Sequence, residues 1–281
     1  MAPKRSDRPI TKADLEAFIT TQDDFALELF AYSLALEFGF AATHAGSYTD
    51  RITGKTRQFD VRANKKCGSE FHVYLAVECK CLSPSFPLLI SQIPRHPLES
   101  FQDVIRGAGD AQVRHGRTHY PEFRVSRFDR GNSLYPVNRY VGKALVQVGL
   151  NERGDFVSND SEVFEKWGQA IASANGQLRT AADLSARAGM SQASIVLPVL
   201  LVPDEMLWVA NYSENGKLQE GPVQQDEVRF YIGDKHKFDP EIMREFTISH
   251  LHIVTKTGFR NLLEQFADDD HELSYLLQTL P

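Results

Sequence analysis

Two neighbouring stretches of the chain alternate between apolar and polar residues with a period of two. The first is Arg57–Ala63 and the second is Leu75–Lys80. This period predicts a pair of β-strands, and the intervening Cys67-Gly68-Ser69 has the composition of a turn. One face of such a hairpin carries a stripe of residues suited to a hydrophobic core: Phe59, Val61, Val73, Leu75, Val77 and Cys79.

The polar face of the predicted hairpin gathers three charges. A hairpin centred on Ser69 places Asp60 directly opposite Glu78, and the Cβ atoms of cross-strand partners lie roughly 5 Å apart. Like charges at that spacing repel each other. Lys80 follows Glu78 by two residues and therefore projects from the same face. Two carboxylates and an ammonium group converge beside a hydrophobic sheet, an arrangement suited to holding a divalent cation.

A helix is predicted upstream of the hairpin, from Thr21 to Phe38, and is expected to end at Gly39. Its residues are apolar nearly all round, so we expect it to be largely buried. Glu28 shares a stripe with the small residues Ala31 and Ala35, which would let the helix lie close to a sheet.

The remainder of the chain continues with both kinds of element. Ser161–Asp183 has the pattern of a long helix, and Ile195–Val202 that of a strand buried on both faces. Residues 82–100 contain four prolines and predict no regular element. Four further strands are expected at Phe40–Ser47, Met206–Tyr212, Glu227–Ile232 and Phe246–Thr255. Two short helices are expected at Gly258–Phe266 and after Asp268-Asp269-Asp270.

This order of elements predicts an α/β layer fold, a mixed central sheet with helices on both sides. Residues 1–20 are expected to form a basic N-terminal arm. Residues 21–205 form the core, interrupted by an insertion over 82–160. Residues 206–281 are expected to extend the sheet and add helices.

Composition limits the classes of function. With 281 residues, of which 42% are hydrophobic and 24% charged, the chain can bury a sizeable core. A net charge of −6 argues against a chain that binds nucleic acid over its whole surface, but not against a basic patch. Cys67, Cys79 and Cys81 form no extracellular disulfide pattern. Because no apolar run is long enough to span a membrane, we expect a cytoplasmic protein with no membrane partner.

The spacing of Asp60 and Glu78-Cys79-Lys80 resembles the signature of the PD-(D/E)XK nuclease superfamily, an acid followed by (Asp/Glu)-x-Lys. The predicted helix with Glu28, ending in Gly39-Phe40, is similar to the opening helix of the Mrr-like restriction endonucleases in that superfamily. Phe59 stands where the family pattern has proline, a departure that many of its divergent members share.

The resemblance covers residues 21–81 and the helix and strand at 161–202. It implies a restriction-endonuclease-like fold and an endonuclease that hydrolyses phosphodiester bonds of nucleic acid, most of all DNA. It also implies a role in restriction or phage defence, with a partner protein that supplies specificity or activation. A homodimer is expected because cutting both strands requires two sites.

The chemistry of the residues supports a metal site. Mg²⁺ prefers few carboxylates, several waters and phosphate oxygens, and we expect Asp60 and Glu78 to be its ligands, with Mn²⁺ as a substitute. A bound cation would neutralise their repulsion and lower the pKa of a bound water. Lys80 would orient or deprotonate that water, or stabilise charge in the transition state. By resemblance, the Cys79 carbonyl is a third ligand and Glu28 is a supporting acid.

Other interpretations of these residues stay open. Lys80 could form salt bridges with Asp60 and Glu78 in a hairpin that has no catalytic role. The fold could also serve a binding or assembly module without activity of its own. An active enzyme of the same fold could cut RNA in place of DNA.

The segment 106–143 is locally basic and interleaved with aromatic residues. It could contact phosphates and stack on bases, or form a solvated loop. Gln169, on the second long helix, is a further candidate contact, although a plain surface position is favoured. The arginines of the segment taken as candidate contacts are Arg114, Arg117, Arg124 and Arg127.

Two groups of metal-binding residue types are better explained without a metal. The three cysteines and His72 could suggest zinc, but Cys79 and Cys81 point to the core face of the predicted strand and His72 to the other, so buried thiols are favoured. His250 and His252 share a face of another strand. No third ligand is evident beside them, and an ordinary half-exposed pair is favoured.

Overall fold

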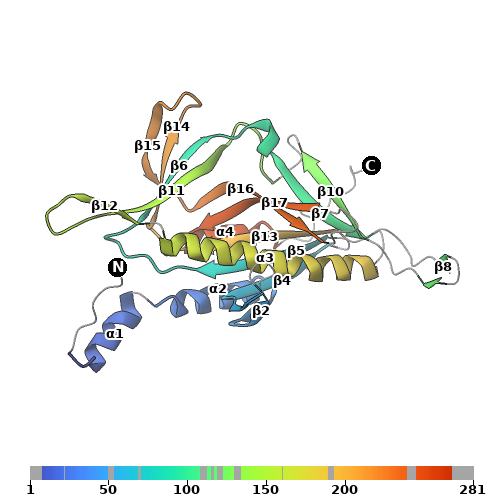
Figure 1. The fold of residues 1–281 in the computed structure, drawn as a ribbon, viewed down its shortest axis with the longest axis horizontal. Coiled ribbons are helices and arrows are strands. Elements are labelled where there is room, and N and C mark those ends of the chain that lie inside the picture. The colour runs from blue at the N-terminus through green and yellow to red at the C-terminus, as the bar shows by residue number, and fades with distance from the viewer. Residues whose placement is uncertain are drawn as a thin grey trace.

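A large mixed β-sheet organises the molecule in the computed structural model (Figure 1). Helices cover parts of both faces, so the predicted α/β layer arrangement is confirmed. The structure describes residues 8–21, 23–49, 54–68, 71–107, 113–114, 117–118, 123–129, 134–159, 161–188, 193–238 and 245–267.

One half of the sheet contains the predicted hairpin and a parallel centre. Strands β5, β13 and β17 run parallel to one another, while β4 runs antiparallel to β5 and β16 runs antiparallel to β17. In spatial order this half consists of β1 (Ala41–His44), β4 (Val61–Cys67), β5 (Phe71–Cys79), β13 (Ala193–Leu201), β17 (Glu245–Val254) and β16 (Glu227–Lys237). Every residue of β13 is buried, as its continuous apolar run predicts.

The other half continues from β16 and ends in the β14–β15 hairpin at the upper left of Figure 1. Its strands are β11 (Tyr140–Leu150), β6 (Leu88–Pro94), β14 (Leu207–Tyr212) and β15 (Leu218–Gln224), with β12 (Phe156–Asn159) paired to β11. Off the main order, β7 (Phe101–Gly107) pairs with β13 of the first half and with β10 (Phe123–Asp129). Two small separate ladders are β2 (Ser47–Thr49) with β3 (Thr56–Gln58), and β8 (Val113–Arg114) with β9 (Arg117–Thr118).

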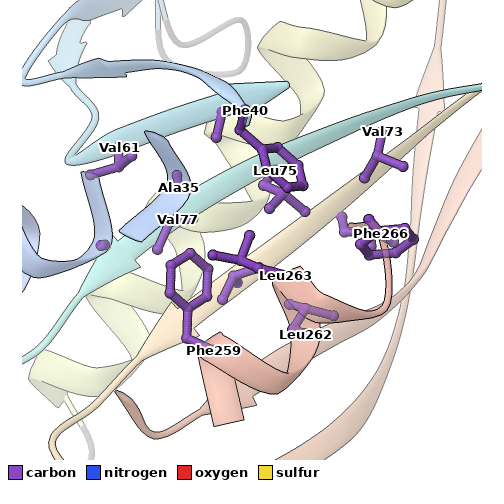
Figure 2. Close-up of a cluster of buried hydrophobic side chains, with 14 of the residues drawn as sticks. Ala35, Phe40, Val61, Val73, Leu75, Val77, Phe259, Leu262, Leu263 and Phe266 are labelled. Atoms are coloured by element: carbon purple, nitrogen blue, oxygen red, sulfur yellow. The ribbon is translucent and has the colours of Figure 1, made fainter. Parts of the chain in front are cut away.

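Two helices cover the face of the sheet that carries the apolar stripe of the hairpin. They are α2 (Phe25–Glu37) and α4 (Lys256–Glu264). Figure 2 shows Phe259, Leu262 and Leu263 of α4 packed against Leu75 and Val77 of β5. Each fully buried side chain of this size contributes roughly 1.5–3 kcal/mol, so the cluster is a principal source of stability.

The long helix α3 (Ser161–Ala188) lies across the opposite face (Figure 1). Small buried residues line its contact with the sheet: Ala170, Ala174, Ala181 and Ala182. Because these side chains are short, the helix axis lies close to the strands. Two polar contacts fix its position, from Arg62 to Ser173 and from Gln177 to the carbonyl of Leu75.

The expectation that residues 82–100 form no regular element is wrong. Residues 82–100 form β6 and the short 3-10 helix η1 (Pro97–Glu99), because Pro94 and Pro97 stand at element ends, where a missing N–H costs little. The segment taken as an insertion over 82–160 supplies five strands to the main sheet. Of these strands, β6 pairs only with partners far away in sequence, β11 and β14, so local pattern carries little trace of it.

Helix α2 is also more exposed than its composition predicts. Phe25, Leu29 and Leu36 lie on its outer side and are exposed, because only one side of the helix contacts the sheet. A further helix, α1 (Lys12–Thr21), lies within the predicted arm over 1–20, and Asp14 accepts hydrogen bonds from Thr11 at its start.

Strands β16 and β17 and helix α4, all late in the sequence, are central to the molecule. β17 lies between β13 and β16, and α4 belongs to the main apolar cluster. The short helix expected after Asp268 lies outside the described residues. None of the helices in the described ranges has both the length and the apolar character needed to cross a membrane.

Candidate active site

An open cleft lies where the start of β4, the end of β5 and the first turns of α3 meet. Its volume is about 700 Å³. Most of the side chains that line it are charged, in contrast to the apolar clusters on either side of the sheet. They are Glu28, Arg57, Gln58, Asp60, Lys80, Glu162, Glu165, Lys166 and Gln169.

The register of the hairpin brings two acids together here: Asp60 lines the cleft, and the buried Glu78 lies beside Asp60 without lining the cleft. Val61 pairs with Val77, so the next pair outward is Asp60 and Glu78, as the alternation predicts. One oxygen of Asp60, Oδ2, accepts a hydrogen bond of 2.8 Å from the backbone N–H of Cys79. This bond fixes the Asp60 carboxylate against the end of β5.

Glu78 is completely buried, with 0% of its surface exposed. Among the described residues neither of its carboxylate oxygens has a hydrogen-bond partner. Burial, together with the negative charge of Asp60, raises the pKa of Glu78 to about 9. A buried acid without hydrogen-bond partners is costly, and a cation placed between Asp60 and Glu78 would reduce that cost.

A second lysine enters the site from α3. The ammonium group of Lys166 lies 2.7 Å from Oδ2 of Asp60, 3.7 Å from Glu78 and 3.8 Å from Asp24. Burial disfavours the charge of Lys166, but the three carboxylates, Asp60 first, raise its pKa above the ordinary value. Neither Lys166 nor Asp24 was singled out by the sequence. For Lys166, the sequence feature that could have pointed to the site is its spacing from Glu162 and Gln169, which places all three on one helix face.

Lys80 lies in the cleft but does not pair with the two acids in the way that the non-catalytic interpretation requires. Its ammonium group lies 2.8 Å from Glu162 in the first turn of α3. Glu162 is largely exposed, whereas the Lys80 side chain is 17% exposed. Lys80 is therefore held at the wall of the cleft by a partner that solvent can readily replace.

Glu28 reaches the same cleft from α2. Its carboxylate lies 2.8 Å from Nε2 of His44 in β1. Burial raises the pKa of Glu28, and the bond to His44 acts against that shift. Asp24, one turn earlier, accepts a hydrogen bond from the backbone N–H of Cys81, and burial raises its pKa as well. The acids of α2 are thus tied to the strands on either side of Asp60.

The donor set at Asp60 and Glu78 fits Mg²⁺ or Mn²⁺. Within the described ranges no three His, Cys, Asp or Glu side chains gather closely enough to hold a metal by themselves. Mg²⁺, however, is usually held by one or two carboxylates, with waters and substrate phosphates completing its shell. Two hard oxygen donors, one of them buried without a partner, meet that requirement.

No protein-family model, curated protein or solved structure matches this chain. Assignment of the cleft therefore rests on its own chemistry.

Gln169 is brought to the cleft, but Arg124 is not. Arg124 pairs with Arg106 of β7, which pairs with Ala193 at the start of β13. Ala193 is level with Phe71, seven residues from Glu78 along β5, or about 23 Å at roughly 3.3 Å per residue.

Two of the other candidate arginines, Arg114 and Arg117, are backbone partners in the β8–β9 ladder. Arg127 has a role within the fold, since it makes two hydrogen bonds, of 2.6 and 2.9 Å, to the buried carboxylate of Asp103.

The structure tests the predicted burial of the three cysteines and of the pair His250 and His252. Cys67 and Cys79 are buried, as expected, while Cys81 is partly exposed. Burial raises the pKa of the Cys79 thiol well above its ordinary value. The expectation of half-exposed histidines is wrong, because His250 and His252 are both buried, in a polar network on β17.

Proposed function

We propose that this protein is a metal-dependent nuclease that hydrolyses phosphodiester bonds, with DNA as its substrate. The observation that carries the proposal is the fully buried Glu78 carboxylate, whose oxygens have no hydrogen-bond partner among the described residues, level with Asp60 at the wall of a charged cleft. Its support from the sequence is the resemblance to the PD-(D/E)XK superfamily. The role in restriction or phage defence, an activating partner, a homodimer and a cytoplasmic location are proposals on the same basis.

In this proposal Asp60 and Glu78 hold the divalent cation, with the Cys79 carbonyl as a further ligand. The chemistry that a bound Mg²⁺ supplies is polarisation of the phosphodiester and a lowered pKa of the attacking water. Glu78 gives up its proton when the cation binds. The Asp60 carboxylate keeps its orientation through the Cys79 N–H.

Lys80 and Lys166 would stabilise the negative charges of the phosphate and of the carboxylates. Lys80 leaves Glu162 and donates to the phosphate oxygens, where negative charge increases in the transition state. Lys166 positions Asp60 and offsets the repulsion between the acids. Glu28, whose pKa is raised by burial, would accept a proton from the attacking water at the edge of the site, and the bond to His44 would orient its carboxylate. Gln169 and Arg57 offer donors to the backbone of the nucleic acid along the cleft wall.

The test is cleavage of supercoiled plasmid DNA, with a labelled RNA in parallel, in Mg²⁺ or Mn²⁺. We expect Asp60→Asn, Glu78→Gln and Lys80→Met each to reduce cleavage by about 100-fold or more. Lys217→Met is the matched control, because Lys217 lies in the exposed turn between β14 and β15. Equal cleavage by the wild type and Lys80→Met would exclude Lys80 from the mechanism. Faster cleavage of the RNA would make the enzyme a ribonuclease.

The second candidate function is a nuclease-like binding or assembly module without activity. One observation favours it: Lys166 already supplies a cation to Asp60 and Glu78. This alternative predicts that calorimetry with Mn²⁺ gives no binding heat in the wild type. Saturable Mn²⁺ binding that Asp60→Asn removes would contradict it, even if cleavage required a further partner.

A further inference from the structure

A second cleft lies on the other face of the sheet, with a volume of about 550 Å³. It is formed where the end of β6 and the segment before β11 approach the start of β16. Three of its lining residues are arginines, in a chain whose net charge is −6. The side chains used below are Arg95, Arg139, Tyr140, Glu227 and Arg229.

The strand registers place this cleft apart from the candidate active site. Glu78 is level with Leu200 of β13, then Ile253 of β17, then Val228 of β16, so these four side chains share one face. Glu227 and Arg229 flank Val228 and therefore project from the opposite face. Ligands of the two clefts would not touch each other through the sheet.

Arg95 is the central feature of the second cleft. Its residue is only 2% exposed, and its Nη1 donates to the carbonyl of Pro136. Within the described part of the chain its Nε has no hydrogen-bond partner. Burial and the like charge of Arg229 lower the pKa of Arg95 to about 10. The cleft therefore holds a buried guanidinium with an unused donor and a repelling neighbour.

Arg229 and Arg95 are held in place by an aromatic support. Their guanidinium carbons lie 6.0 and 5.7 Å from the ring centre of Tyr135, which is fully buried. Tyr135 stacks on His250 at 3.7 Å, and its hydroxyl bonds Nε2 of His252. The two arginines are thus fixed before any ligand arrives.

The one acid of the cleft is already neutralised. Burial opposes the charge of Glu227, but the bonds from His252 and Arg229 lower its pKa to about 2, so it is ionised. Its oxygen lies 2.9 Å from Nδ1 of His252, which must donate, leaving Nε2 of a neutral ring to accept from Tyr135. Glu227 therefore offsets Arg229, and the charges of Arg95 and Arg139 remain.

We propose that this second cleft binds the phosphate group of a small molecule. Two remaining positive charges match a phosphate dianion, and a guanidinium presents paired donors in the geometry of phosphate oxygens. The volume lies within the range of roughly 300–1,000 Å³ found for small-molecule sites. The exposed ring of Tyr140 at the edge provides a surface on which a base or another flat group can stack.

The experiment is isothermal titration calorimetry of the whole chain at fixed ionic strength, in EDTA so that no divalent cation bridges phosphate to Asp60 and Glu78. The probes are inorganic phosphate, adenosine 5′-monophosphate and adenosine. The variants are Arg95→Met and the exposed Arg139→Met, which leaves the core intact. Arg153→Met, in the exposed turn after β11, is the control with the same change of charge. Asp60→Asn tests independence from the first cleft.

The expected result is saturable binding of phosphate and of the monophosphate, unchanged in Arg153→Met and Asp60→Asn. Arg95→Met and Arg139→Met should each weaken it by about tenfold or more, the loss expected for one charged hydrogen-bonding partner. Adenosine alone should not bind. No binding of either phosphate by the wild type at about 10 mM would overturn the proposal. Binding that survives both arginine substitutions, or that adenosine matches, would also overturn it.

Discussion

The protonation of Glu78 makes the free energy of unfolding of the whole protein depend on pH. An ordinary glutamate titrates at 4.5, and the pKa of Glu78 in the folded chain is about 9. Between these two values the folded state binds more protons at this position than the unfolded state. Stability is therefore greatest near the lower pH and is lost as pH rises toward 9.

Replacing the ionisable group tests this linkage. Glu78→Gln should be more stable than the wild type at pH 9 in EDTA, by roughly 1–3 kcal/mol beyond any difference at pH 5, because the variant buries no charge. Urea denaturation at both pH values measures the free energies of unfolding. Glu214→Gln, in the exposed β14–β15 turn, is the control. An equal difference between Glu78→Gln and the wild type at both pH values would contradict the prediction.

Under the proposed function, Lys166 would compete with a cation bound at Asp60 and Glu78. In EDTA, Lys166→Met should lose about 1–3 kcal/mol of stability, since Asp60 loses a charged hydrogen-bond donor. Mn²⁺ should then raise the melting temperature of Lys166→Met more than that of the wild type, because the cation would no longer displace an ammonium group. Thermal melts with and without Mn²⁺ measure this, with Lys217→Met as control. The same Mn²⁺ shift in all three proteins would show that Lys166 and the metal do not compete.

The part of the site that was predictable from sequence is the part that depends on strand alternation. Asp60 and Glu78 are placed by one hairpin whose register follows from its turn, so their pairing could be read from spacing. Lys166 comes from a helix more than 80 residues later, and its approach depends on how α3 lies on the sheet. No local pattern contains that information.

At the level of elements, Arg127 illustrates how a basic residue can be structural. It links β10 to Asp103 of β7, and the same carboxylate accepts from the backbone N–H of Thr247 in β17. One buried acid thus connects three strands. A surface stretch rich in arginine favours a nucleic-acid contact on composition alone, and only the pairing of β7 with β10 reveals the other role.

The strand connection can be tested by comparing two arginines of β10. Arg127→Met should lower the free energy of unfolding by about 1–3 kcal/mol, because Asp103 keeps its buried charge without the guanidinium. Arg124→Met, at an exposed position of the same strand, should stay within about 0.5 kcal/mol of the wild type. Urea denaturation of both variants provides the values. Equal losses for the two would refute the structural role.

At the level of the whole molecule, elements late in the sequence complete the centre of the sheet. β17 pairs with β13 on one side and β16 on the other, and α4 covers β5 (Figure 2). Such pairing between distant segments is why a local reading of the chain found the hairpin, α2, α3 and β13 but treated 206–281 as an extension.

Removing the late strands should therefore abolish the fold. A chain ending at Pro203 lacks β16, β17 and α4, and its central strand β13 is left with an open edge and an uncovered apolar face. We expect no cooperative thermal transition by circular dichroism. In the NMR spectrum, the amide proton resonances should be broad and poorly dispersed. A sharp transition in the truncated chain would mean that residues 21–203 form an independent unit.

The length of α3 gives the cleft a distant point of control. Its 28 residues extend about 42 Å at 1.5 Å per residue, with Glu162 and Lys166 at one end and Ala181 and Ala182 pressed on the sheet near the other. A larger side chain at Ala181 would push the C-terminal end of α3 away from the sheet. The helix would then tilt about Ser173, which stays bonded to Arg62. The carboxylates would stay on their strands while the ammonium group moved. A substitution at Ala181 could thus change the distance between Lys166 and the two carboxylates without altering any residue that lines the cleft.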